Sequence, residues 1–167
     1  MTAPGERPPN CIPTLEQVPE ELHGYLQFIC CRYEWRSDRW TKVPVNPRNG
    51  KLASVNDAAT WAHLEGTLQR TVELDCDGIG FVFTRTDPFC GIDLDHCLNP
   101  ATGEITEQAA EIVALLDSYT EVSPSGTGLH IIVRGKPTSD RQRAQGVEVY
   151  GWSHFLTITG RTYGGAS

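Results

Sequence analysis

The chain has 167 residues, a net charge of −7 and 39% hydrophobic residues. A chain of this length forms one domain, or two small modules that share a site. It has no apolar run of membrane-spanning length, and its proline-rich N-terminus lacks the apolar stretch of a signal peptide. We therefore expect a cytoplasmic protein that does not associate with a membrane. The net negative charge argues against a protein that coats nucleic acid along its length.

The first half of the chain predicts a lead-in, two strands and a helix. Residues 1–19 contain five prolines and are expected to be flexible, with the folded domain spanning residues 20–167. Two runs, 25–33 and 40–45, have strand-like composition and are separated by a polar turn, which predicts a pair of strands. Asn56 is a typical N-cap residue, and the apolar spacing after it predicts a helix to about Gln69.

The second half predicts a hairpin, one helix and four more strands. Residues 78–84 and 89–95 are strand-like and flank a turn, which predicts a hairpin. Thr106 is expected to cap a helix over residues 107–117. The remaining strands are expected at 119–122, 129–133, 147–150 and 155–159, the last two closing the same sheet. The pattern predicts a mixed α/β or α+β class with a largely antiparallel sheet.

The run Gly91–Asp95 carries the strongest functional signal. Side chains alternate along a strand, so Asp93 and Asp95 share one face while Ile92 and Leu94 share the other. Two carboxylates on one face of a buried strand repel each other unless a partner compensates them. Hard divalent cations seek carboxylate oxygens, so the pair predicts a site for one or two metal ions. The polar face of an edge strand is the alternative.

The run Ser123–His130 predicts a phosphate-binding loop. Gly126 and Gly128 let the backbone approach a ligand and expose its amides, and Ser125 offers a hydroxyl. His130 opens the next strand and could donate to a triphosphate oxygen. An ordinary hairpin turn would look similar, and no Walker-type lysine follows the glycines.

Three further residues are candidates for the same site. Glu148 lies in an alternating strand, and it would add a third carboxylate if that strand neighbours the one with Asp93. Arg161 follows a Thr-Gly strand end and could bind a phosphate as a planar fork, with a surface arginine as the equal alternative. Lys42 is a weaker candidate for a phosphate or template contact.

Two stretches, 32–51 and 134–143, are basic within this acidic chain. They suit a localised polyanion site, although solvated surface charges would look the same. Trp35 and Trp40 lie in the first stretch and could stack on the bases of single-stranded DNA.

The six cysteines contain no CxxC pair, and a disulfide scaffold is not expected in a chain with this much core. A zinc site from Cys90, His96 and Cys97 is conceivable but has no evident fourth ligand. Buried free thiols are the favoured interpretation.

Taken in order, three motifs resemble those of the archaeo-eukaryotic primase superfamily, in particular the bifunctional primase–polymerase domain of phages and plasmids. Gly91–Asp95 is similar to its hhDxD motif, Ser125–His130 to its SxH motif in the form SGxGxH, and Val147–Tyr150 to its third acidic motif. The similarity runs from about Gly24 to Arg161. Three motifs in this order are more specific than any one of them.

The resemblance implies an α+β fold in which an RRM-like catalytic sheet (residues 76–167) packs against an N-terminal α/β module (residues 20–75). It implies Mg²⁺ or Mn²⁺ on Asp93, Asp95 and Glu148. The residues assigned to nucleotide binding are Ser125, Gly126, Thr127, Gly128, His130, Arg161 and Lys42.

The expected function is template-directed nucleotidyl transfer on single-stranded DNA from dNTP or NTP, in a chain that is either a fragment or a complete small protein. A replicative helicase in the same or a separate chain is an expected partner. A Rep-type or metal-dependent nuclease is one alternative, but a Rep-type enzyme needs a His-x-His pair, and His130 has no second histidine two residues on. A non-catalytic nucleic-acid-binding module is the other, although it would gain nothing from repelling carboxylates.

Overall fold

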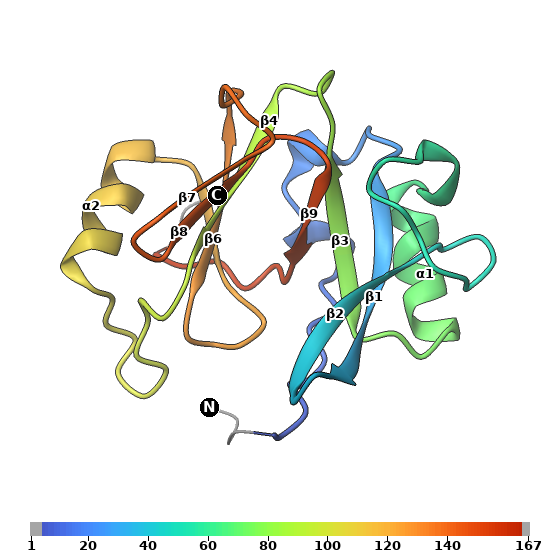
Figure 1. Cartoon of the computed structure of the whole chain (residues 1–167), viewed down its shortest axis with the longest axis horizontal. Coiled ribbons are helices and arrows are strands. Elements are labelled where there is room, and N and C mark those ends of the chain that lie inside the picture. The colour runs from blue at the N-terminus through green and yellow to red at the C-terminus, as the bar shows by residue number, and fades with distance from the viewer. Residues whose placement is uncertain (1–4, 165–167) are drawn as a thin grey trace.

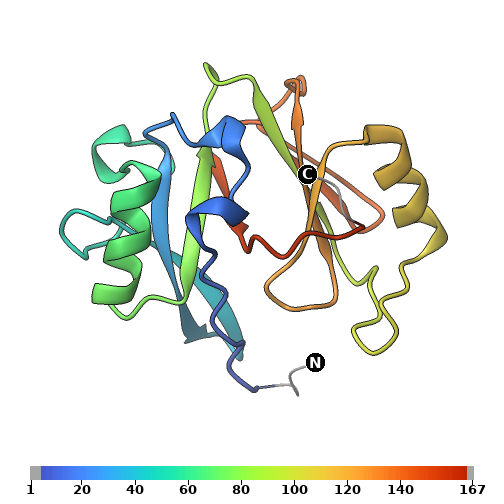
Figure 2. The same cartoon turned by 180° about the vertical axis from the view of Figure 1, so that it is seen from behind.

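The computed structural model describes residues 5–164, which form two antiparallel β-sheets and two α-helices (Figures 1 and 2). This arrangement confirms the predicted α+β class. Within residues 5–164, no helix is both long enough and apolar enough to cross a membrane.

The first sheet has the strand order β2-β1-β3-β9. Its strands are β1 (Phe28–Arg36), β2 (Arg39–Val45), β3 (Gly78–Phe83) and β9 (His154–Ile158). Helix α1 (Leu64–Glu73) packs against β1 and β3. Strand β1 pairs with β3 through residues 28–31 and with β2 through residues 30–36. Residues 32–43 therefore extend beyond the rest of the sheet as a two-stranded ribbon.

The second sheet has the order β5-β6-β4-β8-β7. Its strands are β4 (Phe89–Leu94), β5 (Tyr119–Val122), β6 (Leu129–Arg134), β7 (Arg141–Ala144) and β8 (Val147–Tyr150). Helix α2 (Glu107–Leu116) is capped as predicted, because the Thr106 hydroxyl accepts from the Ala109 amide at 3.2 Å. The helix packs on the face that carries Ile92 and Leu94. The opposite face therefore turns toward the first sheet (Figure 1).

One hydrophobic core joins the two sheets. Phe83 and Leu156 of the first sheet belong to the same buried cluster as Phe89 and Ile132 of the second. Gly91 permits the close approach, since a Cβ there would lie 2.7 Å from the Phe83 ring and 3.1 Å from Leu156. The sheets are thus packed at a point where a side chain larger than hydrogen does not fit.

The predicted hairpin of residues 78–84 and 89–95 is wrong. Strand β3 pairs with β1 and β9, whereas β4 pairs with β6 and β8. A turn does separate the two strands, as predicted, but at this turn the chain passes from one sheet to the other. The prediction that residues 155–159 close the same sheet as residues 147–150 is also wrong, because β9 returns to the first sheet. Residues 76–167 therefore supply strands to both sheets.

The helix predicted over residues 56–69 is wrong in position. Asp57 rather than Asn56 provides the cap, and it caps a single 3₁₀ turn, Ala58–Thr60. Trp61 then leaves the turn in an extended conformation, and its indole donates to the Ser54 carbonyl oxygen at 2.7 Å. Helix α1 begins only at Leu64.

Candidate active site

Five polar residues form a row across the second sheet, on the face turned toward the first sheet. In strand order the row is Glu121 (β5), His130 (β6), Asp93 (β4), Glu148 (β8) and Arg143 (β7). Each residue lies directly opposite the next, and directly opposed residues of antiparallel strands project to the same face. We call this set the polar row. It places Glu148 on the strand next to Asp93.

A cavity of about 210 Å³ lies where the polar row meets the ribbon. Its lining residues are Pro8, Tyr33, Trp40, Lys42, Asp93, Asp95, Ser123, Pro124, Ser125 and His130. The predicted site residues among them are Lys42, Asp93, Asp95, Ser125 and His130. The predicted residues outside this lining are Gly126, Thr127, Gly128, Glu148 and Arg161. The cavity therefore unites two acidic residues with a lysine, a serine and a histidine.

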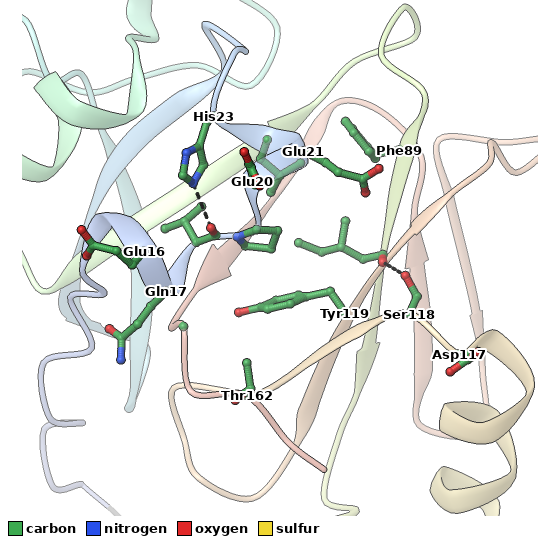
Figure 3. A pocket seen from close by; sticks show the side chains of 15 residues that line it. Glu16, Gln17, Glu20, Glu21, His23, Phe89, Asp117, Ser118, Tyr119 and Thr162 are labelled. Carbon is green, nitrogen blue, oxygen red and sulfur yellow. Dashed lines mark hydrogen bonds between the residues drawn. The ribbon is translucent and has the colours of Figure 1, made fainter. Parts of the chain in front are cut away.

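A larger cavity, of about 900 Å³, lies between the N-terminal segment and β5 (Figure 3). Its lining includes four acidic side chains, Glu16, Glu20, Glu21 and Asp117, and none of the predicted site residues. Among residues 5–164, no lysine or arginine lines the larger cavity, whereas Lys42 lines the smaller one, and an acidic lining without such a cation does not suit a polyanionic substrate. We therefore take the smaller cavity as the candidate active site.

Asp93 is partly buried in the smaller cavity, where its side chain is 20% exposed. Burial raises the pKa of Asp93 above its ordinary value; His130 opposes the shift and the neighbouring Asp95 reinforces it. Asp95 follows the end of β4 and is exposed. The ionised form of Asp93 is thus held in a site that disfavours it, and a bound cation would relieve that cost.

His130 is fixed with one ring nitrogen toward the cavity. Its Nδ1 donates to the Thr157 carbonyl oxygen at 2.9 Å, because a carbonyl oxygen can only accept. Its Nε2 lies on the side of Asp93, 3.7 Å from Oδ1. The ring is 1% exposed, so the cavity is the place where Nε2 can meet a ligand.

The glycine loop packs against the end of β4. The Ser123 hydroxyl accepts from the Gly128 amide at 3.2 Å and lies 3.0 Å from the Ser125 hydroxyl. A Cβ on Gly128 would lie 2.5 Å from the Leu94 carbonyl oxygen, so this approach requires glycine. Gly126 has a φ of +79°, which also favours glycine. The loop thereby holds Ser125 beside the carboxylates.

Arg161 lies at the base of this loop. Its guanidinium donates to the Ser123 carbonyl oxygen at 2.7 Å, and its carbonyl oxygen accepts from the Val122 amide at 2.8 Å. In this structure Arg161 therefore supports the loop from outside the cavity.

Glu148 bonds to its own strand and to β7. Its carboxylate accepts from the Tyr150 hydroxyl at 2.6 Å and pairs with Arg141 at 3.0 Å and Arg143 at 3.5 Å. Burial acts to raise the pKa of Glu148, but the tyrosine and the two arginines outweigh it and the pKa is lowered. Each carboxylate oxygen already has a cationic partner.

Residues 5–164 contain no group of three or more His, Cys, Asp or Glu side chains arranged to hold a metal ion. The fit to a divalent cation therefore depends on the two carboxylates of Asp93 and Asp95, whose hard oxygens are the appropriate ligand type. Cys90, His96 and Cys97 do not form a cluster of this kind, and all six cysteines are free and buried.

Three groups of residues around the site have roles that their sequence signals did not reveal. Ser123 lies in the predicted phosphate-binding loop, but the sequence did not indicate that its hydroxyl holds the loop in shape. Arg141 and Arg143 alternate with Gln142, a signal that they share one face, but nothing indicated Glu148 as their partner. Glu121 lies in a short strand, and its partners are distant in sequence.

Comparison with known proteins finds a relative among phage replication proteins that is named a DNA primase-polymerase. The chain is 39% identical over 150 residues to a DNA primase-polymerase of Nitratiruptor phage NrS-1, a match that covers 86% of this chain and 20% of that protein. The chain is therefore related to a DNA primase-polymerase over most of its length, while it spans about a fifth of the length of that relative. No protein-family model matches the chain.

Proposed function

We propose that this domain catalyses template-directed nucleotidyl transfer: it moves a nucleoside monophosphate from dNTP or NTP to a 3′-hydroxyl on single-stranded DNA and releases pyrophosphate. The observation that carries the proposal is the 210 Å³ cavity, which gathers Asp93 and Asp95 with Ser125 and His130. The relationship to a DNA primase-polymerase supports the same reaction class. A replicative helicase is the further partner that we expect.

Asp93 and Asp95 would hold Mg²⁺ or Mn²⁺, with Glu148 as the third ligand on the neighbouring strand. The bound ions would supply activation of the attacking hydroxyl and stabilisation of the leaving pyrophosphate. Glu148 would exchange arginine contacts for metal contacts on joining this site.

Lys42, Ser125 and His130 would bind the triphosphate of the incoming nucleotide. Lys42 supplies positive charge in the cavity, and Ser125 supplies a hydroxyl that can donate to a phosphate oxygen. His130 would bind as the imidazolium, in which Nδ1 keeps its bond to the Thr157 carbonyl oxygen and Nε2 donates to another phosphate oxygen. The loop glycines and Arg161 would act indirectly, because they shape and support the loop that holds Ser125 in the cavity.

The ribbon would bind the single-stranded template. Trp40 lines the cavity, while Trp35, its partner across the ribbon, is 47% exposed. Arg36 and Arg39 face each other beside this pair. An aromatic surface next to arginines is the combination that binds single strands without reading their sequence.

The proposal is tested by primer extension on a single-stranded DNA template with Mg²⁺ or Mn²⁺. Wild-type protein is expected to extend the primer, and Asp93→Asn combined with Asp95→Asn is expected to abolish extension. Asp117→Asn is the matched control, because Asp117 lies at the end of α2 with a φ of +43°, a conformation that asparagine tolerates. Wild-type protein that neither extends a primer nor binds a nucleoside triphosphate would contradict the proposal and favour a non-catalytic binding module.

A further inference from the structure

We propose that Glu121 is a positioning residue that fixes the His130 ring so that Nε2 faces the cavity. This inference rests on the proposed nucleotidyl transfer, in which His130 contacts the triphosphate. Glu121 itself does not line the cavity, and it would act through His130.

Glu121 is fully buried and has a partner for each carboxylate oxygen. One oxygen accepts from the Tyr119 hydroxyl at 2.8 Å and the Gly160 amide at 3.3 Å. The other accepts from the amide and hydroxyl of Thr159 at 2.8 and 3.0 Å and lies 3.4 Å from His130 Nδ1. A buried carboxylate needs such partners, and this many hold it in one place.

These contacts decide which way the His130 ring faces. Thr157 and Glu121 both present oxygens to Nδ1, at 2.9 and 3.4 Å, on the side away from Asp93. A flipped ring would place carbon against both oxygens and would lose both contacts. The Nε2 atom is therefore kept on the cavity side.

The arrangement also joins three strands from two sheets. Glu121 is on β5 and His130 on β6, whereas Thr157 belongs to β9 and Thr159 and Gly160 follow it. Tyr119, which donates to Glu121, lines the larger cavity on the other side (Figure 3). Glu121 thus lies in the wall between the two cavities and holds His130 against the end of β9.

Glu121→Gln preserves the shape of the side chain but replaces one acceptor by an NH₂ group, which can only donate. In either orientation that group would face a backbone amide, of Thr159 or of Gly160. We expect the contacts around His130 to loosen in this variant.

Asp87→Asn is the matched control. Asp87 is 4% exposed, and its carboxylate accepts from the amides of Thr84 and Phe89 at 2.6 and 2.8 Å and from Lys136 at 3.0 Å. Its replacement also sets an amide group against backbone N–H groups. Asp87 lies in the turn between β3 and β4, outside the cavity lining. The Asp87→Asn variant therefore measures the effect of lost stability alone.

The experiment measures the affinity of each variant for a non-hydrolysable α,β-imido dNTP in the presence of Mg²⁺. We expect Glu121→Gln to weaken binding of the analogue about tenfold, which corresponds to the loss of one charge-assisted hydrogen bond. The Asp87→Asn variant should change the affinity by less than about twofold. Primer-extension kinetics should show the same change in KM for the nucleotide. Adding Glu121→Gln to His130→Ala should weaken binding no further, because the residue acts through His130.

Two outcomes would overturn the inference alone: wild-type affinity in Glu121→Gln, or a loss in the double variant that multiplies the two single losses. Failure of wild-type protein to bind the analogue would overturn the proposed function and this inference with it. If Glu121→Gln does not fold, ¹⁵N NMR of the His130 ring in wild-type protein decides. The expected result is a proton on Nδ1 and a shift of Nε2 on adding the analogue. A ring without a proton on Nδ1 would overturn the inference, because Nδ1 could then donate to neither Thr157 nor Glu121.

Discussion

Asp93 and Glu148 lie side by side on neighbouring strands, yet their surroundings act on them in opposite ways. Glu148 has a tyrosine and two arginines as partners, and its pKa is lowered. Asp93 faces Asp95 in a partly buried cavity, and burial raises its pKa. A carboxylate that would hold the metal ion is therefore one whose charge the fold disfavours.

A stability measurement can detect this conflict. In a buffer with EDTA at neutral pH, Asp93→Asn is expected to leave the melting temperature unchanged or to raise it, because the amide carries no charge. A carboxyl whose pKa is higher in the folded than in the unfolded state stabilises the fold as pH falls through that folded value. Wild-type protein should therefore gain a stabilising contribution on mild acidification that the variant lacks. A lower melting temperature for Asp93→Asn at neutral pH would contradict this prediction.

At the residue scale, the sequence predicts a shared face only where side chains alternate along a strand. Alternation predicted that Asp93 and Asp95 point the same way, and the cavity contains both. Alternation does not reveal partners across space. Glu121 was missed because Thr159, its main partner, is 38 residues away on the segment that follows another sheet's strand.

At the scale of elements, the ribbon extends beyond the rest of the first sheet, because β3 pairs with β1 only through residues 28–31. Its turn contains Ser37 and Asp38 with φ values of +50° and +60°, as in the tight turns that match strand twist. Trp35 and Trp40 lie opposite each other with ring centroids 5.5 Å apart and an interplanar angle of 69°. The Trp40 indole is held by a hydrogen bond to the Gly5 carbonyl oxygen at 3.2 Å, which leaves Trp35 as the exposed ring.

Trp35→Ala is expected to weaken binding to an oligo-dT strand by about 1–3 kcal/mol, the contribution of one base stacked on an aromatic ring. Fluorescence anisotropy of a labelled oligonucleotide measures this loss. Trp152→Ala is the control, because Trp152 stacks on Arg85 at 4.5 Å outside the ribbon. Equal affinity of wild type and Trp35→Ala would place the template elsewhere.

Element predictions failed where a local signal had more than one outcome. The turn residues before Phe89 indicate a reversal of the chain, but not whether the next strand returns to the same sheet. Asn56 and Asp57 are both good caps, and the segment that follows forms one 3₁₀ turn before α1 begins at Leu64. Local composition cannot distinguish these cases, because long-range packing selects between them.

For the whole molecule, the contact at Gly91 couples the two sheets. Gly91→Ala is expected to destabilise the protein by about 1–3 kcal/mol, since its methyl group would overlap the Phe83 ring. Gly66→Ala is the control, because this position in α1 has open space around it and alanine favours a helix by up to about 1 kcal/mol. Urea unfolding followed by tryptophan fluorescence and by circular dichroism should give coincident transitions for both variants. Separate transitions would show that the sheets unfold independently.

Strand β9 completes the first sheet late in the chain, pairing Ile158 with Ile79 of β3. During translation the ribosome therefore releases Asp93, Asp95 and His130 well before the segment that holds His130 in place. The Thr157 carbonyl and the Thr159 and Gly160 amides emerge last among these groups. A nascent chain would carry its acidic pair early, but the geometry required for nucleotide binding would form only once β9 had left the exit tunnel.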